Sequence, residues 1–261
     1  MSVLLDFKNV DVSYGKNKVI NDVSFSLKKG EILGLVGESG SGKSTLIKVI
    51  VGLLGPQGRV AGGDILFEGK NLTGFSEKEM QKVRGEEIGM IFQDAGASLC
   101  PIRTIGSQIV ESMAAHRKVN AAQAKEDALE LFEKLKFKDG ERVWNSYPFE
   151  LSGGMNQRAG IAIAMLMNPK ILLADEPTSA LDVAVQRQVV REMLDLRDIF
   201  GTSIILVTHD LGVVSAAADT IVVLRNGKVM ESGSKEEVLN DPKDEYTKDL
   251  LNAVPKLRRS K

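Results

Sequence analysis

One eight-residue segment restricts this chain more than any other: Gly37-Glu38-Ser39-Gly40-Ser41-Gly42-Lys43-Ser44. It fits the pattern G-x-x-x-x-G-K-[ST] and stands between an almost wholly apolar run, Glu31–Val36, and a helix-forming stretch, Ser44–Leu54. Glycines let the backbone turn its N–H groups inward, and the helix that follows presents its positive end there. The segment therefore predicts a strand, a loop and a helix that bind phosphate. The alternative is a chance glycine-rich turn, which the flanking apolar strand disfavours.

The same segment indicates which kind of phosphate compound binds. We expect Lys43 to place its ammonium group against the β- and γ-phosphates of a nucleotide, and the Ser44 hydroxyl to coordinate magnesium. Thr45 follows directly and completes the predicted binding residues of this loop. A nucleoside triphosphate with Mg²⁺ is the expected ligand.

Two adjacent carboxylates, Asp175 and Glu176, end the apolar run Ile171–Ala174. The carboxyl end of a buried strand is where open α/β sheets bind ligands. We expect Asp175 to hold magnesium, and Glu176 to orient the attacking water or accept its proton. Taken alone, an Asp-Glu pair after apolar residues is more often a solvated strand end. The phosphate loop upstream favours the catalytic interpretation.

Strand and helix patterns alternate along most of the chain. Because Glu31–Val36 is apolar on both faces, it suits a parallel sheet covered by helices. From Ile105 to Asn168 helical signals dominate, with Asn120 as an expected N-cap, which indicates a helical insertion. Asn226-Gly227 predicts a hairpin turn. Further strands are expected at Asn9–Tyr14, Asp22–Leu27, Asp64–Gly69, Ile88–Phe92 and Ser203–Thr208, and helices at Ser76–Arg84, Val183–Phe200 and twice near the end of the chain.

Composition narrows the class of protein. A hydrophobic fraction of 43% and a charged fraction of 26% over 261 residues are ordinary globular values. The net charge of -1 gives no overall reason to bind nucleic acid, and the basic end, 256–261, is expected to be a solvated tail. A single cysteine, Cys100, suits a reducing compartment. The start lacks a secretory pattern, and the longest apolar run, which lies between Arg158 and Pro169, is too short to span a membrane, so any membrane role is expected to require a partner.

A second motif is more selective than the phosphate loop. Leu151-Ser152-Gly153-Gly154 looks like the signature of ABC proteins, and the chain resembles the ATPase subunits of ABC transporters over nearly its whole length. Other matches are Tyr14, Gln93, His209 and the run Ser179–Asp182 after Glu176. Singly, Tyr14 reads as a strand residue, Gln93 as a surface amide and His209 as a strand-end histidine. Taken together, the order of these residues along the chain favours the roles that they have in the ABC family.

The resemblance implies a role for each matching residue. Tyr14 stacks on the base of ATP, Gln93 senses magnesium and the attacking water, and His209 contacts the γ-phosphate. The signature residues begin a helix, which suits them to grip phosphate. In the family, two ATPase domains pack head to tail, and each ATP lies between one phosphate loop and the signature of the other domain. The predicted site residues are catalytic Glu176, His209, Gln93 and Lys43; nucleotide-binding Tyr14, 37–45, Gln93, Ser152, Gly153, Gly154, Asp175, Glu176, Asp182 and His209; and Mg²⁺-binding Ser44, Gln93 and Asp175.

The resemblance also implies the fold and the domain organisation. The expected class is α/β, a P-loop NTPase core of the RecA type with an N-terminal antiparallel β subdomain and an inserted helical signature subdomain. The whole chain, 1–261, would form one ABC ATPase domain. Its core and β subdomain would comprise 1–94 and 169–240, the helical subdomain 95–168 and the C-terminal tail 241–261.

A narrower resemblance concerns the subfamily and the partners. The runs Tyr147–Glu150, Glu176–Gln186 and Tyr246–Leu251 look like those of bacterial importers for di- and oligopeptides or nickel-type substrates. Such an importer has two membrane subunits, two ATPase subunits that are often paralogues, and an extracytoplasmic binding protein. The chain is thus expected at the cytoplasmic face of the cell membrane, with ATP hydrolysis coupled to import.

The chain departs from the family pattern at three places. Met155 replaces a common glutamine, although methionine is familiar in this subgroup. Ala95 and Cys100 replace a common proline and asparagine in 94–105, where contacts with the membrane partner are expected. With no further cysteine, no iron–sulfur cluster is expected, and Cys100 is expected to be a partly buried side chain.

Two other functional classes share some of these features. A soluble ABC ATPase of an assembly or repair complex would carry the same nucleotide motifs. The subfamily runs and the lack of a long coiled-coil insertion favour the importer. A binding or purely structural module would leave Glu176 and His209 without a role.

Overall fold

The computed structural model describes residues 2–93, 98–179 and 182–253. Asp94, Ala95, Ala180, Leu181 and the basic segment 256–261 lie outside the described residues. The chain forms two compact units, Met1–Thr73 with Leu206–Lys261, and Gly74–Ile205. Strand β8 (Ser203–Thr208), as predicted, leads from the second unit into the first.

An antiparallel sheet of the order β2-β1-β4-β5 forms much of the first unit. Phe7 and Phe25 stack across β1 and β2 with ring centroids 4.4 Å apart. Both strands run further than predicted because bulges interrupt the alternation of apolar residues, with Asn9 and Asp22 at positive φ. The strands are β1 (Val3–Tyr14), β2 (Asn17–Lys28), β4 (Gly58–Phe67) and β5 (Lys70–Asn71), with a 3₁₀ turn at Leu72–Gly74.

A second sheet in this unit carries the phosphate loop. Strand β3 (Ile32–Val36) is wholly buried and pairs in parallel with β9 (Thr220–Arg225), which pairs antiparallel with β10 (Lys228–Ser234). The turn between β9 and β10 confirms the prediction from Asn226-Gly227, because both residues have positive φ, 48° and 73°.

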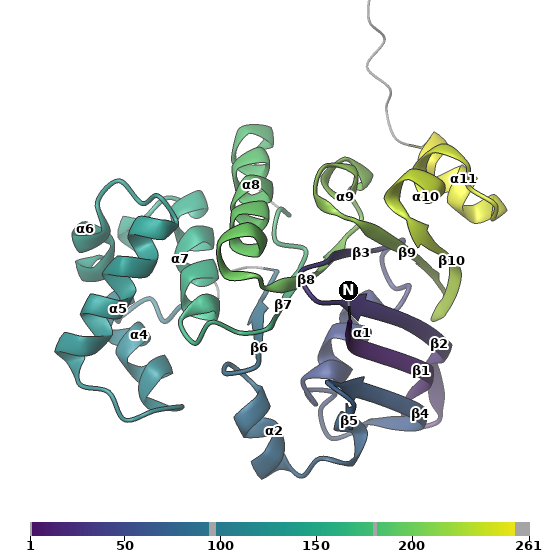
Figure 1. Ribbon diagram of the computed structural model, residues 1–261, viewed down its shortest axis with the longest axis horizontal. Helices are drawn as coiled ribbons and strands as arrows, with labels where there is room; N and C mark the ends of the chain where they lie inside the picture. Colours follow the sequence, from purple (N-terminus) through teal and green to yellow (C-terminus); the bar gives the residue numbers. More distant parts are fainter. Residues whose placement is uncertain (1, 94–97, 180–181, 254–261) are drawn as a thin grey trace, which may run out of the picture. The chain divides into compact units, whose positions relative to one another are not determined.

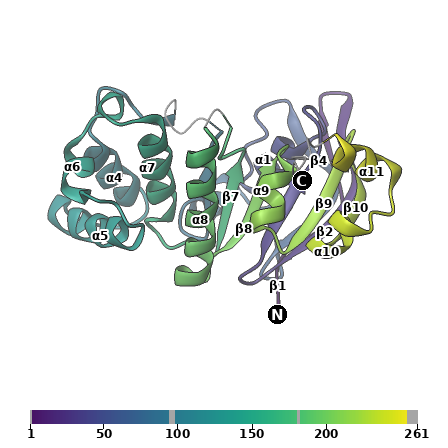
Figure 2. The same ribbon diagram turned by 90° about the horizontal axis from the view of Figure 1, so that it is seen from above.

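Among its described residues, the same unit has four helices. Helix α1 ends at Ile50, earlier than predicted, because Gly52 adopts a left-handed conformation and the Leu53 N–H bonds the Lys48 carbonyl. Helix α9 packs on β3, whereas α10 and α11 lie beside β10 (Figures 1 and 2). The bounds are α1 (Lys43–Ile50), α9 (Leu211–Ala217), α10 (Lys235–Asn240) and α11 (Glu245–Asn252).

The carboxylate of Glu231 on β10 holds the start of α11. It accepts the N–H groups of Lys243 at 2.7 Å and Asp244 at 3.2 Å. Burial acts to raise the pKa of Glu231, but the Lys243 N–H, the Thr247 side chain and the Asp244 N–H outweigh it and hold that pKa below its usual value. The carboxylate therefore stabilises the folded chain at neutral pH.

We expect Glu231→Gln to lower the free energy of unfolding by about 1 kcal/mol at pH 7, less than the roughly 1.5–3 kcal/mol of hydrogen bonds to a charged group, because the carboxylate is partly solvated. A lowered pKa in the folded state stabilises fully above the unfolded value, about 4.3, and this effect is lost as pH falls through the folded value. Denaturant unfolding of both proteins from pH 7 to pH 3 should show their difference shrinking below about pH 4. A difference that stays constant across this range would contradict the assignment.

The second unit combines paired strands with a group of helices. Strands β6 (Ile88–Ile91) and β7 (Ile171–Asp175) pair in parallel. Helix α8 (Val183–Phe200) has the predicted bounds, and Gly201 caps it at φ 69°. Helix α2 (Glu77–Val83) follows its cap Ser76.

Among the described residues of this unit, helices α4, α5, α6 and α7 form a cluster (Figure 1). The side chain of Asn120 caps α5 as predicted, accepting the Gln123 N–H at 2.8 Å. Ile109, Phe132 and Ala162 are buried among these helices. The bounds are α4 (Ile105–Ala114), α5 (Ala121–Lys134), α6 (Gly140–Asn145), the 3₁₀ turn η2 (Pro148–Glu150) and α7 (Gly153–Met165).

The predicted division of the chain into a core, a helical subdomain and a C-terminal tail stays a prediction. Within the described ranges, every helix is too short or too polar to cross a membrane.

Candidate functional site

The phosphate loop of the first unit runs from the end of β3 to the start of α1. Gly37 has φ 154°, and a Cβ there would lie 2.1 Å from the Leu224 carbonyl oxygen. Gly42, with φ 107°, precedes α1, and a Cβ there would lie 2.6 Å from Ile20 Cδ1. Only glycine fits either place, so the loop packs closely against neighbouring strands. Between these glycines, Glu38, Ser39 and Gly40 are exposed, whereas Ser41 is buried.

Lys43 is only 5% exposed, and its ammonium group lies inside the loop. It donates hydrogen bonds to the carbonyl oxygens of Gly37 at 2.7 Å and Glu38 at 2.8 Å. A buried ammonium needs such acceptors. They fix the positive charge beside the loop backbone at the start of α1, where a helix favours anions. Ser44 is exposed and Thr45 half-buried in the same first turn.

Two other predicted residues lie in the first unit. Tyr14 is half-buried at the end of β1, where it pairs with Asn17 and Gly58. His209 is exposed directly after β8. The next residue, Asp210, caps α9 by accepting the Gly212 N–H at 2.7 Å, which fixes the backbone beside His209.

The two predicted carboxylates lie in the second unit at the end of β7. Asp175 is buried, and Glu176 is half-buried with φ 46°, a left-handed conformation that a glutamate rarely adopts. The Glu176 carbonyl oxygen accepts the Ser179 N–H at 3.0 Å and the Ser179 hydroxyl at 2.9 Å. Such strain persists where neighbouring contacts enforce it, and it concentrates at functional sites. A tight turn therefore fixes where the Glu176 side chain begins.

The structure brings Gln93 and Glu176 together. The Gln93 side-chain amide donates to a Glu176 carboxylate oxygen at 3.3 Å, although the two residues are far apart in sequence. Ser179 also reaches the Gln93 carbonyl oxygen, at 3.5 Å. The predicted water-binding amide and the predicted catalytic carboxylate are thus neighbours in one unit.

The signature residues begin helix α7 in the same unit. Ser152 caps the helix, its hydroxyl accepting the Met155 N–H at 3.3 Å. Gly154 faces α8, since a Cβ there would lie 3.0 Å from Val185 Cγ1. Asp182 caps α8 by accepting the Ala184 and Val185 N–H groups at 3.0 Å. The caps of α7 and α8 thus lie on helices in contact, and both helix starts can attract an anion.

A buried ion pair lies one turn further along α7. Arg158 pairs with Glu192 of α8, donates to the Leu135 carbonyl at 2.5 Å, and lies over the Phe137 ring at 4.2 Å. Together these contacts tie α7 to α8 and to the end of α5. They limit how the signature can tilt within its unit.

We expect Ser152→Ala to lower the free energy of unfolding by about 1 kcal/mol, because the first turn of α7 loses its side-chain cap. Ser152→Thr is the matched control, since threonine retains a hydroxyl that can cap the helix. Denaturant unfolding measures both variants. Equal stability of Ser152→Ala and the wild type would show that the cap contributes nothing.

One contact at the loop was not predicted. The Glu38 N–H donates to the Tyr246 hydroxyl of α11 at 3.2 Å, across 208 residues of sequence. The run Tyr246–Leu251 marked the subfamily resemblance, but no spacing in the sequence connects this tyrosine with the loop. The other role assignments remain predictions from motif and position.

Comparisons with known proteins agree with these features. A family model described as ABC transporter matches residues 20–179. The chain is 44% identical to the probable peptide ABC transporter ATP-binding protein y4tR of Sinorhizobium fredii, covering 99% of this chain and 79% of that protein. It is 47% identical to the oligopeptide transport ATP-binding protein OppD of Bacillus subtilis, covering 98% and 73%.

Solved structures give the same result for the fold. The ATP-binding cassette MJ0796, in a dimeric post-hydrolysis state bound to ADP and Pi, has a TM-score of 0.76 at 28% identity, covering 89% of this chain and 99% of that one. The cbiO1 protein of Clostridium perfringens, part of the ABC transporter complex cbiONQ, has a TM-score of 0.81 at 26% identity, covering 92% of each chain. The predicted α/β P-loop NTPase class is confirmed.

Proposed function

Because this chain belongs to the ABC transporter family, we propose that it is the ATP-hydrolysing subunit of a bacterial importer whose cargo is a peptide. The observation that carries the proposal is the similarity to peptide-transport subunits along almost the whole chain. The subfamily runs that resemble such importers support it. Nickel or a metal chelate is the alternative cargo within the same subfamily.

ATP binding is assigned first to the phosphate loop. The positive start of α1 and the Lys43 ammonium suit the β- and γ-phosphates. Lys43 is already oriented by two loop carbonyls, so little order has to be gained on binding. Tyr14 is assigned to the base, which its ring can stack on.

The donor chemistry of three predicted residues fits Mg²⁺. A hydroxyl from Ser44, an amide oxygen from Gln93 and a carboxylate from Asp175 are hard oxygen ligands of the kind that magnesium prefers. When bound, the ion would neutralise charge on the β- and γ-phosphates. Asp175 is buried at the end of β7, which suits a carboxylate that binds a metal ion.

Hydrolysis is assigned to Glu176. Its carboxylate would accept a proton from, or orient, the water that attacks the γ-phosphorus. Gln93 donates to that carboxylate and can hold it in one orientation. His209 is assigned to the γ-phosphate as a hydrogen-bond donor. Bond breaking then transfers the γ-phosphoryl group to water and releases ADP.

The signature and Asp182 are assigned to a second ATPase subunit's nucleotide. The hydroxyl of Ser152 and the N–H groups of Gly153 and Gly154 would grip phosphate bound in the partner, so that two subunits, identical or paralogous, complete each other. The dimeric state of the similar cassette MJ0796 supports this arrangement. Closing with ATP and opening after hydrolysis would bias the membrane subunits between conformations.

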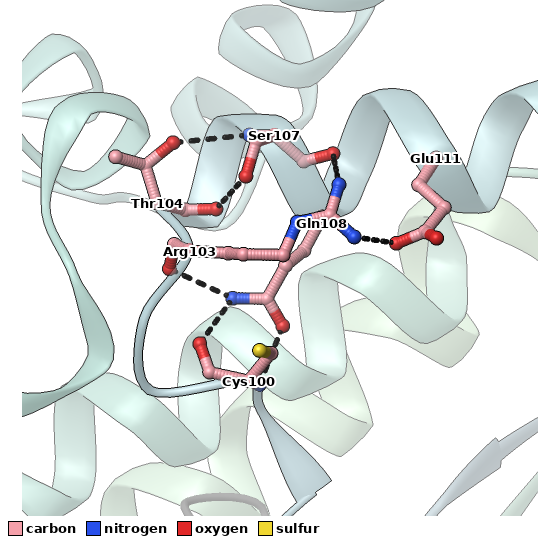
Figure 3. Close-up of polar contacts among 6 residues, drawn as sticks. All are labelled: Cys100, Arg103, Thr104, Ser107, Gln108 and Glu111. Carbon is pink, nitrogen blue, oxygen red and sulfur yellow. Dashed lines mark hydrogen bonds and ion pairs between the residues drawn. The ribbon is translucent and has the colours of Figure 1, made fainter.

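The segment before α4 is assigned to the membrane partners. Gln108 braces this loop by bonding the backbone N–H of Cys100 at 2.8 Å and the carbonyls of Cys100 and Arg103 (Figure 3). Arg103 pairs with Glu111 in the same network (Figure 3). Cys100 is half-buried, as expected.

Exposed apolar side chains lie on this braced loop and on the segment bonded to it. Ile102 is 82% exposed and Phe149, which stacks on Tyr147, is 72% exposed. The Ile105 N–H bonds the Ser146 carbonyl at 2.9 Å and so joins the two segments that carry them. A rigid loop with exposed apolar side chains is suited to bind a cytoplasmic helix of one of the two permease subunits. This contact would hold the chain at the membrane.

Affinity purification of the tagged chain from detergent-solubilised native membranes tests the proposal. We expect two polytopic proteins and a related ATPase, or a second copy of this chain, in stoichiometric amounts. An extracytoplasmic binding protein that reaches the complex through the permease would then be assayed with peptides and with nickel. Recovery of soluble partners alone would favour an assembly or repair complex instead.

A further inference from the structure

A single peptide group at the start of the phosphate loop is held at both of its ends. The carbonyl of Gly37 accepts the Lys43 ammonium at 2.7 Å, and the N–H of Glu38 donates to the Tyr246 hydroxyl at 3.2 Å. These two atoms belong to the same planar peptide group, so they turn together. The Tyr246 hydroxyl therefore fixes the orientation of a carbonyl on which Lys43 rests.

Tyr246 itself is held firmly. Its side chain is only 6% exposed, within a cluster that includes Val36, Leu211 and Val238. The Arg225 guanidinium lies over its ring, 4.5 Å from the centroid. The backbone of α11 is fixed at its start by Glu231 and by the cap Asp244, which accepts the Tyr246 N–H at 2.9 Å. A hydroxyl held in this way is a fixed acceptor.

A second contact from the same region of the chain reaches the loop independently. Gly227, in the turn between β9 and β10, donates its N–H to the Ser41 carbonyl at 2.9 Å. Its own carbonyl accepts the Asn21 N–H at 2.8 Å, and a Cβ on Gly227 would lie 1.9 Å from the Val19 carbonyl oxygen. The β9–β10 turn is therefore locked between β2 and the loop.

We propose that Tyr246 is a positioning residue for the phosphate loop: its hydroxyl orients the Gly37–Glu38 peptide and thereby places Lys43 for nucleotide phosphates. The proposal rests on the assignment of this loop to ATP. Phenylalanine would fill the same space in the cluster, so packing alone does not require the hydroxyl. The buried hydroxyl accepts a hydrogen bond from the loop, and this bond links helix α11 to nucleotide affinity.

The test compares the full chain with Tyr246→Phe and Leu251→Ala. Leu251 is a matched control because it packs against the same cluster. Calorimetry measures the Kd for ADP with Mg²⁺, and nuclear magnetic resonance of ¹⁵N-labelled protein follows the Glu38 amide. For Tyr246→Phe we expect the Kd to rise about 3- to 10-fold, the effect of one lost hydrogen bond, and the Glu38 resonance to shift. Leu251→Ala should lower thermal stability and leave both readouts near the wild-type values.

Each contrary outcome has a separate meaning. Wild-type affinity and an unmoved Glu38 resonance in Tyr246→Phe would overturn the positioning role while leaving the ATP site intact. An equal rise of the Kd in Leu251→Ala would show that α11 acts only through stability, and this too would overturn the role. If the wild type failed to bind ADP at all, the proposed function would fail, and the positioning role with it.

Discussion

Replacing Glu176 with glutamine should reduce ATP hydrolysis by about 10²- to 10⁴-fold, the usual contribution of a positioned acid–base group. ATP binding should persist, because the amide keeps the shape of the side chain and an oxygen that can accept the Gln93 hydrogen bond. Only the negative charge that attracts a proton from water is lost. ATP should then accumulate in closed dimers, which size-exclusion chromatography with and without ATP would detect.

A matched control for this experiment is Glu126→Gln, which alters an exposed carboxylate of α5 in the same unit. Its rate should equal that of the wild type. Undiminished hydrolysis by Glu176→Gln would remove Glu176 from the catalytic role. Loss of ATP binding in that variant would instead indicate that the strained turn at φ 46° depends on the charge.

Lys43→Ala is expected to weaken ATP binding by about 100-fold, or roughly 3 kcal/mol, since it removes charge-assisted hydrogen bonds to phosphate. Turnover at subsaturating ATP should fall at least as far. The variant also leaves the Gly37 and Glu38 carbonyls without their present donor, so the loop loses order as well as charge. Equilibrium binding of ATP and steady-state hydrolysis measure the two effects.

Lys48→Ala is the control for the charge itself, because Lys48 is exposed on the same helix and makes no side-chain contact described for the loop. Its affinity for ATP should stay within about twofold of the wild type, as for a screened surface charge. If Lys43→Ala bound ATP as well as Lys48→Ala does, the loop would not be the phosphate site.

Local sequence rules predicted the parts of the site that depend on neighbouring residues. The spacing of glycines around Lys43 requires a particular backbone, and the structure has it at Gly37 and Gly42. Asn226-Gly227 predicted its turn for the same reason, since both residues tolerate positive φ. The cap at Asn120 likewise needs only a side chain and an N–H three residues away.

Features that depend on distant segments could not be predicted. Glu176 adopts its left-handed conformation because Ser179 and the end of β7 enforce it, and glutamate has no such preference of its own. The bulges in β1 and β2 hid the length of both strands, because the alternation of apolar residues shifts at each bulge. The bond from Glu38 to Tyr246 joins two segments that no local pattern connects.

The supports of the phosphate loop have a consequence for the order in which the protein matures. The ribosome makes the β9–β10 turn and α11 only long after the loop, and Tyr246 of α11 follows Glu38 by 208 residues. A nascent chain that has passed Lys43 therefore carries the motif without the braces that orient it. Because the loop gains these hydrogen bonds only once α11 has been made, a nascent chain that stops before α11 would bind nucleotide more weakly than one that includes it.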